Sequence, residues 1–410
     1  MAKGTRVALL MSRIDDGDDA REARRCEVAA DRAHPGDDVD DYRMKKSRFM
    51  AVTVVGSSTP SIARIAVFRA LQLGDMLCAV PALRALRAAY PRARITLIGL
   101  PWSRELADRY PHYIDEVLEF PGYPGMPERE PERDAMPGFL HEVRERNVDL
   151  AIQLHGNGEI TNPLVARFGA RSLAGFRDPS SSWRADGTFI PWPSLGYEAE
   201  RLLTLIRALG MEVHGEQLEF PVREDDEAEL RTLAREDGWS LRPSGYVCIH
   251  PGARHAAKRW APDRFAVVGD ALAERGLQVV LTGTTSEAAI TAAVAAAMRH
   301  RAVDAAGPMS LGALAALMRD ARFVVCNDTG VSHLAAALRV PSVVVFLSAD
   351  PDRWAPLDDT RHRALYDAKS CVPRGEGARD VGRRCEGGVF PEDVLEAIEL
   401  LPLPERAYAA

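Results

Sequence analysis

The feature that most constrains the fold is an alternation of short β-branched runs with longer amphipathic stretches. It occurs as two series that are separated by an acidic, weakly hydrophobic segment. The strands expected from it are 65–68, 94–98, 117–120 and 150–154 in the first series, and 246–250, 278–281, 323–326 and 342–346 in the second. Strands that alternate with helices in this way form parallel sheets wound with helices. The expected fold class is therefore α/β, with a cleft between two similar units at the carboxyl ends of their strands.

Domain boundaries follow from changes in composition along the chain. Residues 1–60 mix acidic and basic side chains with little periodic hydrophobicity, so we expect a disordered extension there. We expect the first unit at 61–222, a linker region at 223–242, the second unit at 243–388 and a C-terminal helical segment at 389–410.

Composition excludes several classes of function. The net charge of −7 over 410 residues gives no global attraction to nucleic acid. No run approaches the eighteen or more apolar residues of a membrane helix, and no secretory signal is visible at the amino terminus. The six cysteines are scattered, which fits a reducing cytoplasm. Cys371 and Cys385 lack the paired spacing of zinc ligands, so we expect free thiols and no metal site.

The first candidate site is the segment 69–75, which follows the first strand and opens the first helix. Gly74 permits a tight turn, and the Asp75 carboxylate can project from the edge of the sheet into the cleft, where it could act as a base. The alternative is that Asp75 only caps the helix and complements its dipole.

The second candidate is the loop 250–260, which follows the first strand of the second unit. It combines a glycine with several cations, and Lys258 would act as a flexible positive charge on a phosphate. The alternative is a solvated basic loop, in which Arg254 and His255 point to water.

The third candidate is the polar turn 326–333, where a strand runs into a helix. Free backbone N–H groups at such a helix start bind phosphate. Alternatively, Asp328 or Thr329 is a plain helix cap and His333 a core histidine. Weaker candidates are the turn 281–287 and the segment 153–158. The latter resembles the start of a dinucleotide fingerprint, but Thr161 stands where the last glycine would be, so the fingerprint fails.

Several of these motifs together resemble glycosyltransferase family 9, the ADP-heptose:lipopolysaccharide heptosyltransferase family. The matching segments, in the family's order, are 69–75 with 81–86, 250–253 with 258–260, 281–283, 327–330 with 333–338, and 350–351 with 353–354. The resemblance runs from about residue 64 to 401. It implies a GT-B fold of two facing Rossmann-like domains, with the acceptor on the first, the donor on the second, and a C-terminal helix that packs back toward the first.

The resemblance also implies roles for individual residues. Asp75 matches the family's base, and Lys258 with the backbone of Thr329, Gly330 and Val331 would stabilise the departing diphosphate. The further donor and nucleotide residues are His250, Gly252, Thr282, Gly283, Glu287 (on the ribose), Asp328 (near the donor sugar) and His333. The acceptor residues are Arg69, Gln153 and Asn157. The segment 122–137, rich in proline and charge, is expected to be an enlarged loop on the acceptor side.

The implied activity is inverting, metal-independent transfer of a sugar, heptose from ADP, to a hydroxyl of an envelope saccharide. The implied partners are the nucleotide-sugar donor, which is a co-substrate and no bound cofactor, and a saccharide or lipid-linked saccharide acceptor. The implied place is the cytoplasm, with peripheral contact at the inner membrane face. The alternatives are a sugar-nucleotide epimerase of GT-B-like fold and a non-catalytic nucleotide-sugar-binding protein. The oligomeric state stays open.

Overall fold

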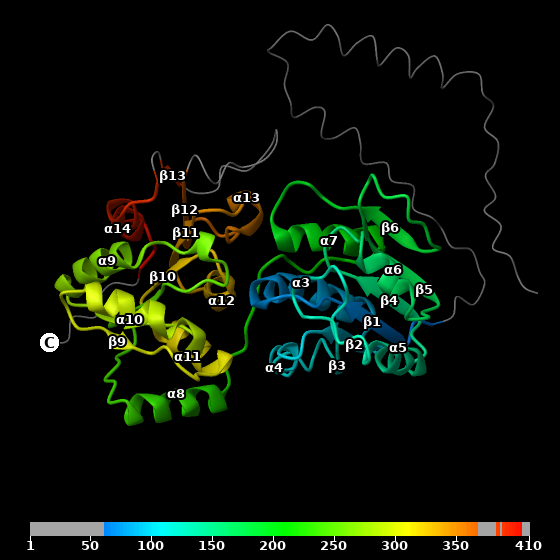
Figure 1. Cartoon of the computed structure of the whole chain (residues 1–410), viewed down its shortest axis with the longest axis horizontal. Coiled ribbons are helices and arrows are strands. Elements are labelled where there is room, and N and C mark those ends of the chain that lie inside the picture. The colour runs from blue at the N-terminus through cyan, green and yellow to red at the C-terminus, as the bar shows by residue number, and fades with distance from the viewer. Residues whose placement is uncertain (1–60, 368–382, 386–387, 404–410) are drawn as a thin grey trace, which may run out of the picture. The chain divides into compact units, whose positions relative to one another are not determined.

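A first parallel sheet of six strands occupies the amino-terminal half of the described chain. The computed structural model describes residues 61–367, 383–385 and 388–403 (Figure 1). The strand order is β3-β2-β1-β4-β5-β6. Their bounds are β1 Arg64–Phe68, β2 Arg94–Gly99, β3 Glu116–Glu119, β4 Leu150–Gln153, β5 Ser172–Arg177 and β6 Thr188–Pro191. The first four were expected, each within one residue at either end, and β5 and β6 were not foreseen.

Helices cover both faces of this sheet, which explains why its central strands are apolar on both sides. All four residues of β4 are buried. One face packs against α5 (Met136–Glu145) and α6 (Thr161–Ala166). The other packs against α3 (Leu73–Ala89), α4 (Ser103–Ala107) and α7 (Glu198–Ala208).

A second parallel sheet of seven strands has the order β13-β12-β11-β10-β7-β8-β9. Its strands are β7 Tyr246–His250, β8 Gln278–Leu281, β9 Val303–Asp304, β10 Val324–Asn327, β11 Ser342–Phe346, β12 His362–Asp367 and β13 Arg383–Cys385. The four expected strands are confirmed within one residue. The helices are α9 Pro262–Glu274, α10 Ala288–Ala297, α11 Leu311–Asp320, α12 Gly330–Leu338, α13 Pro351–Trp354 and α14 Pro391–Glu399, with short 3-10 turns η2 (Ala256–Lys258) and η3 (Thr285–Glu287).

One apolar cluster is shared by the two sheets. It contains the inner faces of both, together with side chains of α3, α7, α11 and α12. Helices α3 and α12 lie against each other in the centre of Figure 1. Two glycines permit this approach: a Cβ on Gly74 would lie 2.6 Å from His333 Cδ2, and one on Gly330 would lie 3.0 Å from Leu73 Cβ. The starts of both helices therefore meet where the two sheets face each other.

Two expectations about the ends of the second unit differ from the structure. The segment 223–242, expected as a linker, contains α8 (Glu224–Glu236), which packs against α11. Helix α14, expected to lie back toward the first unit, packs on α9, β11 and β12 of the second. The reason is that its apolar residues Val394, Ala397 and Ile398 complete the outer core of the second sheet.

Some expectations fall outside the described part of the chain. Residues 1–60, Cys371 and the side chain of Cys385 are among these. Among the described helices, none is both long enough and apolar enough to cross a membrane.

A buried ion pair joins α8 to the first unit. Arg109 donates two hydrogen bonds to Asp226, with Nη1 2.7 Å from Oδ2 and Nη2 2.9 Å from Oδ1. Both side chains are at most 8% exposed. Asp226 also accepts a hydrogen bond from the Arg223 N–H at the start of α8, and Gly312 of α11 leaves room for it, because a Cβ there would lie 1.8 Å from Oδ1.

We expect Asp226→Asn to destabilise the protein by about 3 kcal/mol, because it leaves the Arg109 guanidinium buried without a counter-charge. Chemical denaturation at pH 7.5 measures the change. Asp225→Asn is the matched control, since Asp225 is the exposed neighbour in the same helical turn and should cost less than about 1 kcal/mol. Equal effects of the two substitutions would contradict the prediction.

Candidate active site between the two sheets

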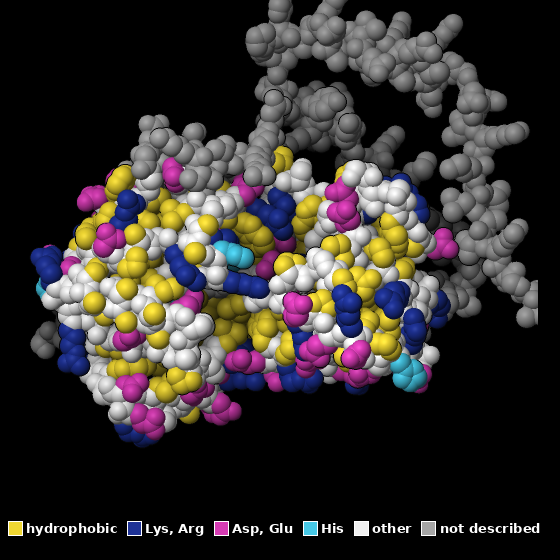
Figure 2. Space-filling view, in the orientation of Figure 1, with side chains coloured by type: hydrophobic (Ala, Val, Ile, Leu, Met, Phe, Trp, Pro, Cys, Tyr) yellow, Lys and Arg dark blue, Asp and Glu magenta, His cyan; other side chains and the backbone are white. Residues whose placement is uncertain are grey.

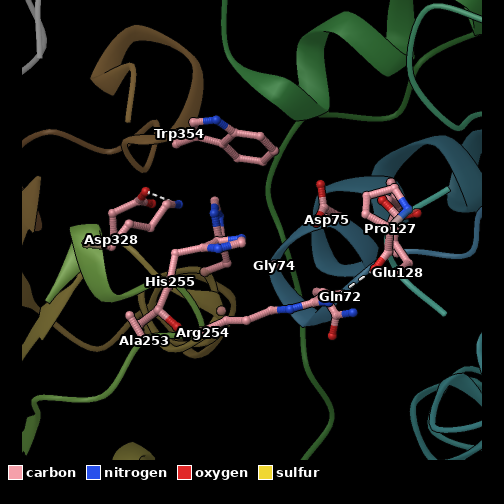
Figure 3. A pocket seen from close by; sticks show the side chains of 15 residues that line it. Gln72, Gly74, Asp75, Pro127, Glu128, Ala253, Arg254, His255, Asp328 and Trp354 are labelled. Carbon is pink, nitrogen blue, oxygen red and sulfur yellow. Dashed lines mark hydrogen bonds and ion pairs between the residues drawn. The ribbon is translucent and has the colours of Figure 1, made fainter. Parts of the chain in front are cut away.

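A cavity of about 280 Å³ opens between the carboxyl ends of the two sheets. Figure 2 shows the hollow between the two halves of the molecule, with Lys and Arg side chains at its border. In the close view, Asp75 and Glu128 lie on one side, and Arg254, His255, Asp328 and Trp354 on the other (Figure 3). The first unit thus contributes two carboxylates to the lining, while Arg254, His255 and Lys258 all come from the second.

Asp75 lies in the first turn of α3 and faces this cavity. The helix begins after Gln72, whose backbone is extended and whose side chain does not cap the helix. Among the described residues, no hydrogen bond joins the Asp75 carboxylate to the backbone N–H groups of the helix start. The capping interpretation therefore has no support from the contacts. The side chain is 24% exposed, and Oδ1 lies 3.8 Å from Arg69 Nη2. Burial raises the pKa of Asp75, and the positive charges of Arg69, Arg353 and Lys258 oppose that rise.

A buried ion network lies behind Asp75. The Arg69 side chain donates from Nε to the Asp75 carbonyl at 2.9 Å and from Nη2 to Glu198 Oε1 at 3.3 Å. Arg353 of α13 donates to the other Glu198 oxygen at 2.7 Å. Burial by itself would raise the pKa of Glu198, but Arg353 and Arg69 hold it below its ordinary value. Because Glu198 belongs to the first unit and Arg353 to the second, this carboxylate joins the two units beside the cavity.

Lys258 lies opposite Asp75, in the turn η2. Its Nζ is 2.6 Å from Asp328 Oδ2, and the Lys258 side chain is 28% exposed. Asn327, fully buried at the end of β10, holds this loop: its amide donates to the Pro251 carbonyl at 2.8 Å, and its Oδ1 accepts from the Trp260 N–H at 2.9 Å. Asn327 was not among the site residues predicted from the sequence, although its hydrogen bonds place Lys258 beside Asp328.

The start of α12 presents backbone N–H groups to the cavity. Thr329 precedes the helix with an extended backbone and makes no side-chain cap. Thr329 and Gly330 line this cavity and a second one next to it, and Val331 lines the second. A helix start without a capping side chain, beside Lys258 and Arg254, is suited to a phosphate group.

The second cavity has a volume of about 470 Å³ and is continuous with the first through five shared lining residues. Its wall combines apolar side chains with a polar turn. The apolar residues are Leu73, Ala305, Met309, Leu311, Leu314 and Val331, and the polar ones include His250, Thr284, Ser286 and Glu287. A flat, partly apolar group attached to a polar ring fits such a lining. Gly283 lines it as expected, whereas Gly252 and Thr282 lie behind the wall.

Glu287 is held in a defined position within this wall. Its Oε2 accepts hydrogen bonds from the Thr284 N–H at 2.9 Å and the Thr284 hydroxyl at 3.0 Å. A Cβ on Gly252 would lie 2.2 Å from Glu287 Oε1, so this glycine makes room for the carboxylate. His250 is buried, with Nδ1 3.1 Å from Thr282 Oγ1, and burial lowers its pKa.

The other predicted donor residues occupy the first cavity. Asp328 lines it beside Lys258, and His333 lies beneath it against Gly74 and Trp354. Burial lowers the pKa of His333 to about 4. Its ring is therefore neutral at neutral pH.

None of the three residues expected to hold the acceptor is among the residues that line the two cavities. Arg69 and Gln153 are fully buried. The Gln153 side chain donates from Nε2 to the His155 carbonyl and to Thr161 Oγ1, the latter at 2.7 Å. Its Oε1 accepts a hydrogen bond from the Phe176 N–H at 3.1 Å. The Asn157 amide donates to Asp178 Oδ2 at 3.1 Å. In this structure they hydrogen-bond within the turns that surround the site, and other side chains line the cavity itself.

Those other side chains include several that the sequence did not mark as site residues. They are Gln72, Pro127, Glu128, Arg254, His255 and Trp354. Arg254 was weighed as a side chain pointing to water, yet its Nη2 is 3.4 Å from the Pro127 carbonyl across the cavity. The loop 122–137 was expected to be enlarged, but nothing in its composition indicated that Glu128 would point into the site.

Within the described residues, no group of three or more His, Cys, Asp or Glu side chains is arranged to hold a metal ion. The cations of the second unit and the helix start are the electropositive groups that this part of the chain places at the cavity.

Comparison with known proteins identifies relatives of the whole described region. The family model of glycosyltransferase family 9 (heptosyltransferase) matches residues 138–377. Lipopolysaccharide heptosyltransferase 2 of Escherichia coli K12 is 27% identical over an alignment of 354 residues, and the match covers 82% of this chain and 97% of the relative. Lipopolysaccharide heptosyltransferase 3 of the same strain is 26% identical over an alignment of 343 residues, with the same coverage of 82% and 97%.

Solved structures show the same fold. The glycosyl transferase family 9 protein from Veillonella parvula superposes with a TM-score of 0.65 at 22% identity, covering 83% of this chain and 97% of the other. Escherichia coli ADP-heptose LPS heptosyltransferase II superposes with a TM-score of 0.61 at 23% identity, covering 82% and 97%. The expected GT-B architecture, two facing α/β units around a cleft, is confirmed.

The raised pKa of Asp75 predicts how stability depends on pH. The folded state holds this proton more tightly than the unfolded chain, so ionisation costs stability as pH rises through the folded pKa. Asp75→Asn should therefore raise Tm at pH 8, and the gain should shrink as the pH is lowered toward the ordinary value of 3.8. Each 1 kcal/mol of relief should shift Tm by about 1–1.5 °C in a protein of this size, because the unfolding entropy grows with chain length.

Asp226→Asn is the opposite control in the same thermal scans. Although burial alone would raise it, the Arg109 and Arg223 contacts lower the pKa of Asp226. That substitution should lower Tm at pH 8, with the loss shrinking in acid. A Tm of Asp75→Asn below that of the unmodified protein at pH 8 would contradict the assignment of Asp75 as a desolvated carboxylate.

Proposed function

The chain belongs to glycosyltransferase family 9, and we propose that it transfers heptose from ADP-heptose to a hydroxyl of an envelope saccharide, with inversion at the anomeric carbon. The observation that supports this most is the arrangement across the cavity: the desolvated Asp75 carboxylate faces Lys258 and the start of α12. Inversion needs a base on the face of the sugar opposite the leaving group.

In the proposed reaction, Asp75 takes the proton of the acceptor hydroxyl while the hydroxyl oxygen forms the new bond to the anomeric carbon. The bond from that carbon to the diphosphate oxygen breaks, and the nucleoside diphosphate leaves with the electron pair. Arg69 orients Asp75 by holding its backbone carbonyl. Because the base and the departing group are held by different units, the packing of α3 against α12 and the Arg353–Glu198 pair between the units set the alignment of the reacting atoms.

The proposed stabilisation of the leaving diphosphate comes from the protein itself. Lys258, Arg254 and the N–H groups at Gly330 and Val331 supply positive charge and hydrogen bonds where negative charge develops. Asp328, now 2.6 Å from Lys258, would hold that ammonium in place before the donor binds. We propose that this set does the work without a metal ion, which activity in excess EDTA would test.

The second cavity is the site that we propose for the nucleoside. Its apolar wall suits a purine, and Glu287 and Ser286 suit the ribose hydroxyls. The relatives named lipopolysaccharide heptosyltransferase favour ADP-heptose as the donor and lipopolysaccharide as the acceptor. We place the reaction at the cytoplasmic face of the inner membrane, where a lipid-linked acceptor would be met.

Asp75→Asn should lower kcat by at least about 100-fold, because a positioned general base contributes 10²–10⁴ to the rate. The affinity for ADP, measured by calorimetry, should stay within about twofold, since Asp75 belongs to the acceptor wall. Mass spectrometry of the products detects transfer. Unchanged turnover would remove Asp75 from the role of base, and an epimerised nucleotide sugar formed from donor alone would contradict transfer itself.

Lys258→Met should weaken ADP binding by about tenfold to a hundredfold, the effect of losing one charge-assisted hydrogen bond. Titrations of ADP, UDP and GDP against the unmodified enzyme should show preference for ADP. Arg275→Met is a matched control, because Arg275 pairs with Glu399 on the outer side of the second unit. A variant that binds ADP as tightly as the parent would overturn the role of Lys258, and equal binding of the three nucleotides would overturn the choice of donor.

A further inference from the structure

Gln72 is a polar residue of the first unit that the proposed reaction does not use. It lies directly before α3, and its side chain does not cap that helix. Among the described residues, no hydrogen bond joins its carboxamide to another group. The residue is half-buried and lines the cavity, so the carboxamide is accessible to a ligand.

The wall that contains Gln72 belongs to both cavities. The residues that line the first and the second cavity alike are Gln72, Gly74, Arg254, Thr329 and Gly330. The first unit contributes Gln72 and Gly74 to this shared wall, and of these two Gln72 has a side-chain hydrogen-bond donor. Because we propose the nucleoside in the second cavity and the sugar in the first, the diphosphate that joins them must pass this wall.

The groups around Gln72 favour an anion at this point. In the close view, Arg254 extends from the second unit toward the side that carries Gln72 and Asp75 (Figure 3). Its Nη2 lies 3.4 Å from the Pro127 carbonyl of that side. The start of α12, which has no side-chain cap, lies on the same wall. A carboxamide N–H would add one more hydrogen bond to an anion held by these groups.

A neutral side chain suits a position one helical turn before Asp75. Residues three apart at the start of a helix lie on the same side, so positions 72 and 75 are neighbours. A cation at position 72 would pair with the Asp75 carboxylate and make it a weaker base, whereas a carboxylate would repel the diphosphate. A carboxamide donates to phosphate oxygen and has neither effect.

We propose that Gln72 donates a hydrogen bond from Nε2 to an oxygen of the donor's diphosphate. This inference rests on the proposed transferase function and adds a donor-binding residue from the unit that carries Asp75. The leaving group is then held by side chains of both units, with Gln72 on one side and Lys258 and Arg254 on the other.

Two substitutions at Gln72 test this contact by calorimetric titration with ADP at pH 7.5. Gln72→Met removes the N–H groups at similar size and should weaken ADP binding by about tenfold, the effect of losing one hydrogen bond to a charged group. Gln72→Glu keeps the shape and adds a negative charge, which should weaken binding by about tenfold more. KM for the acceptor should stay within about twofold in Gln72→Met.

Gln217→Glu is the matched control, because Gln217 is exposed and lines neither of the two cavities. It should leave the affinity for ADP unchanged, and thermal scans establish that all variants fold. A folded Gln72→Glu variant that binds ADP as tightly as the parent would overturn the inference. So would a raised acceptor KM in Gln72→Met with unchanged affinity for ADP, since that result would place Gln72 on the acceptor.

A double variant separates direct contact from an effect through Arg254. If Gln72 contacts the diphosphate itself, Gln72→Met should weaken ADP binding in an Arg254→Met background by the same factor as in the parent, within about threefold. A loss that vanishes in that background would refute direct contact. A parent protein that binds none of ADP, UDP and GDP would count against the proposed function, and the inference would fall with it.

Discussion

The buried carboxylate of Glu198 is the point on which the arrangement of the site depends. It is 1% exposed and is shared by two guanidinium groups, Arg69 from the end of β1 and Arg353 from α13. Removing the Glu198 carboxylate would leave the buried Arg69 guanidinium without its nearest counter-charge in a region that excludes water. Because one partner belongs to each unit, the same interaction holds the Asp75 backbone and links α13 to the acceptor side.

The close approach of two helix starts also links the two units beside the cavity. Gly74 and Gly330 allow α3 and α12 to meet without side chains between them. The Asp75 carboxylate in the first turn of α3, which we propose as the base, is thereby brought to the same cavity as the start of α12, which we propose as the phosphate site. An alanine at either position would need the neighbouring side chain to move, so the close approach of the two helix starts rests on the absence of two methyl groups.

Much of this architecture could be predicted from local patterns. Eight strands were located within one residue, since apolar runs bounded by turns are a local property. Five strands escaped prediction, namely β5, β6, β9, β12 and β13. Of these, β6, β9 and β13 are short strands at the edges of the sheets, which give a weaker local pattern. Asp75, Lys258 and the turn 328–331 were found because polar residues at the ends of predicted parallel strands must share one edge of a sheet. Arg69 and Gln153 were predicted as acceptor-binding residues, but both are fully buried and neither lines the cavity, which no local pattern indicates.

The sequence alone determined the two α/β series, the glycines and polar turns that end their strands, and the motifs that mark the family. The tertiary structure decided which side chains line the cavity and which lie behind them and hold them in place. Glu128 lines the cavity, while Gln153 is sealed behind it. The physical reason is that burial and charge pairing depend on partners distant in the chain: Arg353 neutralises Glu198 from 155 residues away, and no local pattern records that meeting.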